Sequence, residues 1–197
     1  MASALLALHF QNDVVADGGR VALGLASQPV LRTRCLKAAQ ALIEGARGAG
    51  LPVIWVRIAF QPGHTDLVPN APIFRAVAAA GALVDGSWGA EFAQGFSPAA
   101  GEHVITHRRV NAFHNTGLEA YLAGLGIERL ILAGVATNST VEHSARHAAD
   151  LGIEVIVAED ACASARADLH QAALENIRLI GRAETVDVLI RDGMTAA

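Results

Sequence analysis

The chain has 197 residues, the length of one domain, and 52% of them are apolar. Its net charge of −4 and the lack of any basic run argue against a nucleic-acid or membrane partner. No apolar stretch is long enough for a membrane helix, and the two cysteines, Cys35 and Cys162, lie far apart, which favours a reduced, cytoplasmic protein without a disulfide framework.

Short apolar runs alternate with segments of helical periodicity along the chain. This alternation predicts an α/β fold, with a parallel sheet covered by helices on both faces and a single domain over residues 1–197. Strands are predicted at 3–9, 51–58, 102–106, 130–133, 154–158 and 184–186, and helices at 29–48, 74–80, 117–125, from about 139 to 150, and at 168–180.

Residues 59–101 form a long connection rich in glycine and proline, and they carry most of the aromatic side chains. Connections of this length inside compact domains are usually lids or binding loops. The alternative is a loop held down by its own aromatic residues, or a contact between subunits.

The segment 129–150 predicts the position of a site. An apolar run leads into Gly134 and a polar turn, and a helical pattern follows. Ser139 and Glu142 have the spacing of a capping box, which predicts a helix that begins at about Ser139. Thr140 would then lie in the first helical turn, where free N–H groups and the helix dipole favour a developing negative charge.

Binding sites of parallel α/β sheets lie beyond the carboxyl ends of the strands. Five residues at or after the ends of predicted strands should therefore gather at one edge: His9, Ile58, His107, Thr140 and Asp160. The chain has a single lysine, Lys37, on the helix at 29–48, so any mechanism that requires a lysine must use it.

Three segments carry a family likeness: LLALHFQNDVV, then VITHRRVNAFHNTGLEAYLAGLGIERLILAGVATNSTVEHSARHAADLG, and finally VIVAEDACAS. They resemble the isochorismatase-like cysteine hydrolases, which include nicotinamidases, N-carbamoylsarcosine amidohydrolases and isochorismatases. The resemblance implies a three-layer α/β/α fold with a six-stranded, mostly parallel sheet. It also implies a homodimer or homotetramer, and a cis peptide bond between Val135 and Ala136.

The triad of the resembled family has different residues at its matching positions here. The family's aspartate falls on His9, its lysine on His107 and its nucleophilic cysteine on Thr140. The resemblance therefore indicates a divergent member that lacks the Asp-Lys-Cys triad.

Metal and cofactor chemistry is not predicted. Ile58, Phe60 and His64 occupy the places where the metal-dependent branch of the family has its ligands, so two of three ligands are missing. His143 and His147 have a spacing that can bind zinc, but no HExxH motif or third ligand accompanies them. The sequence thus predicts neither a metal ion nor a cofactor.

Two histidines and a hydroxyl allow two kinds of hydrolysis. Thr140 could act as a nucleophile with His107 as its base and His9 orienting that base. Alternatively, His9 or His107 could activate a water molecule without a covalent intermediate. Asp13 lies four residues after His9 and could replace the missing acid or simply anchor its loop.

These residues predict a metal-independent hydrolase for a small-molecule substrate, with Arg109 favouring an anion such as a carboxylate. Two alternatives stay open: a catalytically silent relative that keeps the pocket for ligand binding, and a lyase or isomerase that uses the two histidines. The side chains predicted to line the pocket are Phe10, Phe60, Trp88, Arg109, Asn111, Phe113 and Ala136.

Overall fold

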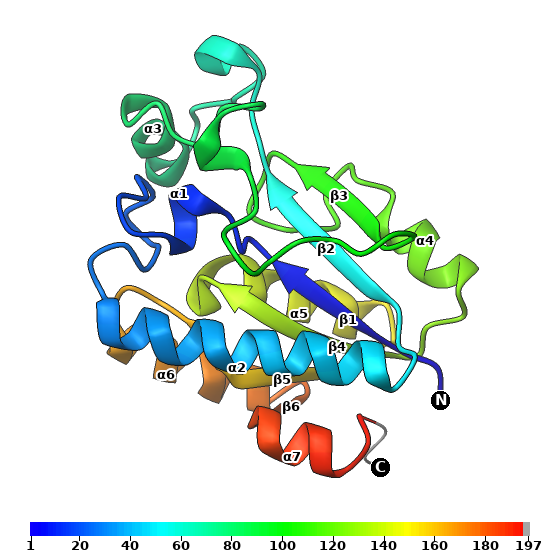
Figure 1. Cartoon of the computed structure of the whole chain (residues 1–197). Helices are drawn as coiled ribbons and strands as arrows, with labels where there is room; N and C mark the ends of the chain where they lie inside the picture. The colour runs from blue at the N-terminus through cyan, green and yellow to red at the C-terminus, as the bar shows by residue number, and fades with distance from the viewer. Residues whose placement is uncertain (195–197) are drawn as a thin grey trace.

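The computed structural model describes residues 1–194. Within that range, six strands form one all-parallel sheet in the order β3-β2-β1-β4-β5-β6 (Figure 1). This confirms the predicted α/β fold and its six-stranded sheet. The strands are β1 (Ser3–Leu8), β2 (Val53–Ile58), β3 (His103–His107), β4 (Arg129–Val135), β5 (Glu154–Ala163) and β6 (Arg182–Glu184).

Helices cover both faces of the sheet because successive strand residues point to opposite sides. Leu5 and Ala7 pack with α2 (Pro29–Gly48) and α7 (Val186–Arg191), whereas Ala4 and Leu6 pack with the opposite layer. Figure 1 shows α2 crossing the near face, with α5 and α6 behind the sheet. The opposite layer consists of α4 (Leu118–Gly124), α5 (Glu142–Asp150) and α6 (Ala167–Arg178).

The turn after β4 differs from its prediction. A π-helical turn, Thr137–Val141, begins directly after the strand, with Ala136 as its N-cap, and no side-chain cap forms there. The Ala136 carbonyl already accepts the N–H groups of Ser139 and Val141, and the Glu142 carboxylate is bound by Arg146 and Asn176. The predicted capping box is therefore wrong.

Further features differ from the prediction: the last strand, β6, lies at Arg182–Glu184 instead of 184–186, and the helix α7 (Val186–Arg191) that follows it was not foreseen. The four-residue helix α1 (Asn12–Val15), which follows β1, was also not foreseen, and β5 continues five residues beyond its predicted end at 158. The predicted short helix in the long connection is present as α3 (Pro72–Ala79). None of the helices within residues 1–194 combines the length and apolarity needed to cross a bilayer.

The 59–101 loop is fixed to the end of β1 by its main chain. The Gln11 side-chain amide donates to the carbonyls of Ile58 and Ala90, at 2.9 and 2.8 Å. The Asn12 amide donates to the Trp88 carbonyl at 2.8 Å. These bonds hold the loop over the carboxyl edge of the sheet.

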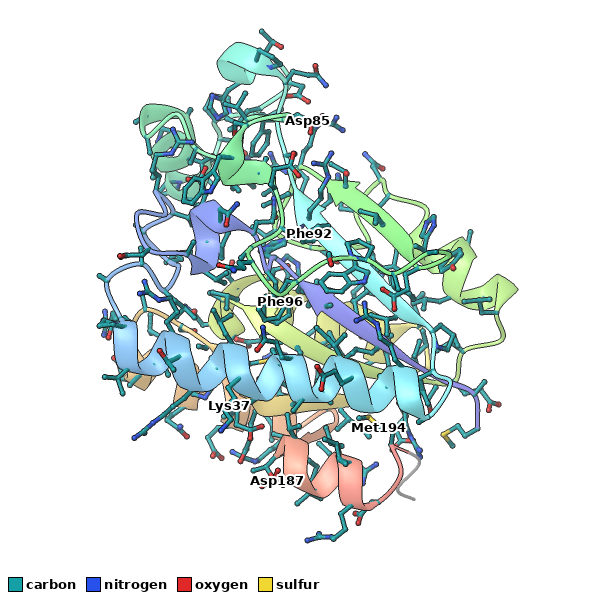
Figure 2. The ribbon with its side chains drawn as sticks, in the orientation of Figure 1. Lys37, Asp85, Phe92, Phe96, Asp187 and Met194 are labelled. Carbon is teal, nitrogen blue, oxygen red and sulfur yellow. The ribbon has the colours of Figure 1, made fainter. Side chains whose placement is uncertain are left out.

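Aromatic side chains of the same loop add to this attachment. Figure 2 shows Phe92 and Phe96 on the part of the loop that runs across the near face. The Phe96 ring stacks on Phe10 with 4.6 Å between centroids, and Phe92 meets Trp55 edge-on at 5.1 Å. The loop is thus held down by its own aromatic residues, as one of the two sequence interpretations proposed.

Candidate active site

Two histidine rings from separate strands meet at the carboxyl edge of the sheet. His9 directly follows β1 with a left-handed φ of 59°, and His107 is the last residue of β3. Their Nε2 atoms lie 2.5 Å apart, and the rings stack with centroids 4.8 Å apart. The contact brings together residues 98 positions apart in the sequence.

Both rings are shielded from solvent, with 7% of His9 and 1% of His107 exposed. Burial lowers the pKa of His107 to about 4, and burial together with the neighbouring ring lowers the pKa of His9 well below its usual value. Backbone hydrogen bonds at Asn111 and Val135 act in the opposite direction, because they favour the protonated rings.

A close approach of β4 to β1 brings the π-helical turn to this histidine pair. Gly134 pairs with Leu8, and a Cβ on Gly134 would lie 2.1 Å from the Leu8 carbonyl oxygen. Its φ of +148° is a conformation that side chains rarely adopt. The Val135–Ala136 peptide bond, one residue further along the chain, is cis, as the resemblance implied.

A cavity of about 50 Å³ lies between the turn and the loop. Its polar side chains are His9, Arg109, Ser139 and Thr140, and the rest of its wall is apolar. The structure thus brings His9 and Thr140 to one space, while His107 lies behind His9 and borders a separate, more open hollow with Arg109.

The Thr140 hydroxyl has no hydrogen-bond partner within the described part of the chain, although only 2% of the residue is exposed. Leaving a buried hydroxyl without a partner costs on the order of 1–3 kcal/mol. An unpaired polar atom beside a cavity is what a ligand with a hydrogen-bonding group would satisfy.

Arg109 supplies positive charge at the cavity wall. Its Nη2 donates to the Asn70 side chain at 2.8 Å, and its Nη1 donates to the Val68 carbonyl at 3.3 Å. No carboxylate among the described residues forms an ion pair with this guanidinium, so its charge is available to an anionic ligand.

Of the other side chains predicted to line the pocket, only Ala136 borders this cavity. Aromatic residues pack against other rings instead, because stacking buries their surface within the core. Phe10 stacks on Phe96, Phe113 stacks on His147, Phe60 is buried beside His64, Trp88 is 55% exposed, and Asn111 bonds to His147.

The cavity wall contains residues that the sequence analysis missed. Ile73, Phe74 and Val77 on α3 face it, as do Val21 and Leu23 from the segment after α1. The apolar spacing on α3 was a usable signal for one face of a short helix. The irregular segment around residue 21 carried no such pattern.

The remaining candidate groups lie outside the cavity. The Asp13 carboxylate is fully buried but bound by Arg20 and by the Leu83 amide, so it anchors its loop. The exposed Asp160 accepts the Val186 amide, and Lys37 is exposed on α2 (Figure 2). Within residues 1–194, no three His, Cys, Asp or Glu side chains cluster as metal ligands.

Neither cysteine has the thiol pKa or the access to the cavity that a nucleophile requires. Burial raises the pKa of the Cys35 thiol to about 12 and that of Cys162 well above its usual value. A cysteine nucleophile needs a lowered thiol pKa and access to the substrate. Both thiols are buried, and neither borders the cavity.

Comparison with known proteins identifies the family of this chain. The isochorismatase domain model matches residues 3–188. The chain belongs to the isochorismatase family. It is 31% identical over 178 residues to the uncharacterized isochorismatase family protein YecD of Escherichia coli O157:H7, covering 90% of this chain and 93% of that protein.

Solved structures have the same fold as this chain. An isochorismatase family protein from Burkholderia thailandensis superposes with a TM-score of 0.79 at 27% identity, covering 98% of this chain and 96% of that chain. A cysteine hydrolase from Pseudomonas syringae pv. phaseolicola superposes with a TM-score of 0.86 at 20% identity, covering 99% and 93%. The second likeness concerns the fold alone.

Proposed function

We propose that this isochorismatase-family chain is a metal-independent hydrolase of a small anionic molecule. In this proposal the acid–base chemistry of His9 and His107 replaces the Asp-Lys-Cys triad, and Thr140 contacts the substrate. The contact between the two buried imidazoles at a cavity that contains an unpartnered hydroxyl carries the proposal.

The site has the groups that hydrolysis requires. One imidazole takes a proton from the attacking oxygen, and the leaving group receives a proton in return. Arg109 binds the anionic end of the substrate, and the Thr140 hydroxyl donates to the reacting group. The apolar remainder of the wall keeps bulk water away and strengthens these polar contacts.

The attacking oxygen belongs either to water or to Thr140, and the two routes differ in whether a covalent intermediate forms. A threonine nucleophile forms an acyl-enzyme, whereas water attack forms none. Mass spectrometry after brief exposure to an activated ester separates them. An adduct that is absent from Thr140→Ala identifies the threonine route, and turnover without any adduct identifies the water route.

A substrate panel tests the activity itself. Amides, ureas, esters and enol ethers, each as a carboxylate and as its neutral methylamide, are incubated with the protein. We expect a carboxylate to be turned over, and His9→Ala and His107→Ala to lower the rate by on the order of 10²–10⁴-fold. His103→Ala is the matched control, because His103 is exposed at the other end of β3.

Two outcomes would contradict the proposal. If both histidine variants keep full activity, the proposed catalytic centre is wrong. If every compound binds without turnover, the chain is a ligand-binding relative rather than a hydrolase.

A further inference from the structure

The cavity beside Thr140 is small for a substrate site. Its volume is about 50 Å³, whereas the open hollow that His107 borders has a volume of about 500 Å³. A cavity needs roughly 10–15 Å³ for each water-sized group, and a cavity of roughly 150 Å³ holds a benzene ring. The space beside Thr140 therefore accepts about three to five such groups and is too small for a six-membered ring.

Hydrocarbon side chains form most of the cavity wall. Val14 of α1 contributes to it, as do Ile73 and Val77 of α3. Figure 1 shows α1 and α3 together beyond the carboxyl ends of β1 and β2. A saturated chain that enters this space is stabilised because its apolar surface leaves water. The wall thus favours a ligand with a short hydrocarbon body.

The two aromatic rings in the described part of the wall are already packed against other groups. The Phe74 ring lies against the Arg109 guanidinium, 4.1 Å from its centroid, and the His9 ring stacks on His107. A pocket that recognises an aromatic ligand usually offers it a ring at stacking distance. This wall is not built to hold an aromatic ligand between two rings.

The charge of the wall matches a ligand with one negative group. Arg109 borders the cavity, and no acidic side chain of residues 1–194 does so. A second anionic group in the cavity would be buried without a counter-charge, which is costly. The buried Thr140 hydroxyl, which has no partner among the described residues, is left to bond to a polar atom of the ligand.

We propose that the ligand is a monocarboxylate with a saturated body of about three to five carbon atoms, and that Ile73 and Val77 set this limit. Arg109 borders both the cavity and the open hollow, so the carboxylate binds there while the body fills the cavity. As a statement about the substrate, this inference rests on the proposed hydrolase function. The binding preference itself requires no turnover.

Ligand-detected NMR titration of the unaltered protein tests the preference. The compounds are acetate, propanoate, butanoate, 3-methylbutanoate, benzoate and butanedioate. Each added methylene group that fits should raise the affinity about fourfold. Benzoate should bind at least about 10-fold more weakly than 3-methylbutanoate, because overpacking a close-fitting space is unfavourable. Butanedioate should bind more weakly than butanoate, because its second carboxylate has no counter-charge.

Three results of this titration would overturn the inference. Benzoate could bind as tightly as 3-methylbutanoate, butanedioate could bind as tightly as butanoate, or none of the aliphatic acids could bind at all. Each result would mean that the volume and charge of the cavity do not select the ligand.

Variants on α3 test which side chains set the limit. Ile73→Ala combined with Val77→Ala removes the branches of both side chains, so benzoate should gain roughly 10-fold in affinity relative to 3-methylbutanoate. Val30→Ala is the matched control, since Val30 is 66% exposed on α2, and it should keep the parent preference. Where the double variant fails to fold, Val77→Ala alone is used. A folded variant that rejects benzoate as strongly as the parent would overturn the role of α3.

The binding experiment and the substrate panel fail independently. If short aliphatic acids bind with the expected preference but no derivative is turned over, the inference stands and the hydrolase proposal is wrong. If the protein hydrolyses a compound with an aromatic body better than any aliphatic one, the hydrolase proposal stands and the inference is wrong.

Discussion

The guanidinium carbon of Arg109 lies 4.1 Å from the centroid of the Phe74 ring. This cation–π contact joins the segment after β3 to α3, and both side chains border the cavity. The ring orients the guanidinium, and the guanidinium in turn holds α3 over the site.

Replacing Arg109 should weaken the binding of anionic substrates specifically. A charge-assisted hydrogen bond is worth about 1.5–3 kcal/mol, so Arg109→Ala should raise KM for a carboxylate by roughly 10- to 100-fold. KM for the matched neutral methylamide should stay unchanged. Steady-state kinetics measures both, and Arg34→Ala, an exposed change on α2, is the control. Equal losses for both compounds would mean that Arg109 only supports the loop.

Replacing the Thr140 hydroxyl by a methyl group should separate stability from activity. Thr140→Val keeps the side-chain shape and removes a buried hydroxyl without a partner, so the free energy of unfolding should rise by about 1 kcal/mol. Activity should fall at the same time, and Thr140→Ser should retain part of it. Urea unfolding and turnover are measured on both variants. A destabilised Thr140→Val protein would show that the hydroxyl has a partner in solution.

The buried carboxylate of Asp13 should be essential for the stability of the loop. It accepts from the Arg20 side chain at 2.9 and 3.0 Å and from the Leu83 amide at 2.7 Å. Asp13→Asn should lower the free energy of unfolding by about 1–3 kcal/mol, because it removes a fully buried charged acceptor whose partner Arg20 is part-exposed. Asp17→Asn is the control, since its side chain is 89% exposed, and it should change stability by less than about 0.5 kcal/mol. Similar effects of the two variants in urea unfolding would contradict this role.

Glu102 should contribute to the pH dependence of the free energy of unfolding at acidic pH. Hydrogen bonds from Arg47, and further ones from the Ala99 amide and the Trp55 indole, lower the pKa of Glu102 to about 2. Since the folded-state pKa is lowered, the stabilisation is present above the usual value of 4.5 and is lost as the pH falls toward 2. The difference in unfolding free energy between the parent protein and Glu102→Gln should therefore shrink from about pH 5 to about pH 2. A constant difference across that range would exclude this linkage.

The sequence predicted the sheet well because its signal is local. Buried parallel strands are continuous apolar runs, and β1, β2 and β3 each appear within two residues of their predicted bounds. The carboxyl-edge rule then placed His9 and His107 at one edge without knowledge of their contact. What pattern analysis could not give was the 2.5 Å separation, since it depends on how two strands on either side of β2 twist together.

The cavity wall was much harder to predict from the sequence. Aromatic residues near the strand ends were expected to line the cavity. Instead, Phe10 stacks on Phe96 and Phe113 stacks on His147. The capping box at Ser139 failed for a related reason, since the Glu142 carboxylate binds Asn176 on α6. In each case a partner distant in the sequence determined the side-chain position, and local spacing contains no information on such partners.

The way the 59–101 loop is held has a consequence for how this protein could diversify. The loop main chain forms hydrogen bonds with the side chains of Gln11, Asn12 and Asp13. Because only carbonyl and amide groups of the loop take part, these bonds do not depend on the loop's side chains. Substitutions of the α3 side chains that line the cavity would therefore leave this attachment in place. Related proteins that keep Gln11, Asn12 and Asp13 could acquire a different ligand preference in this way without a change of fold.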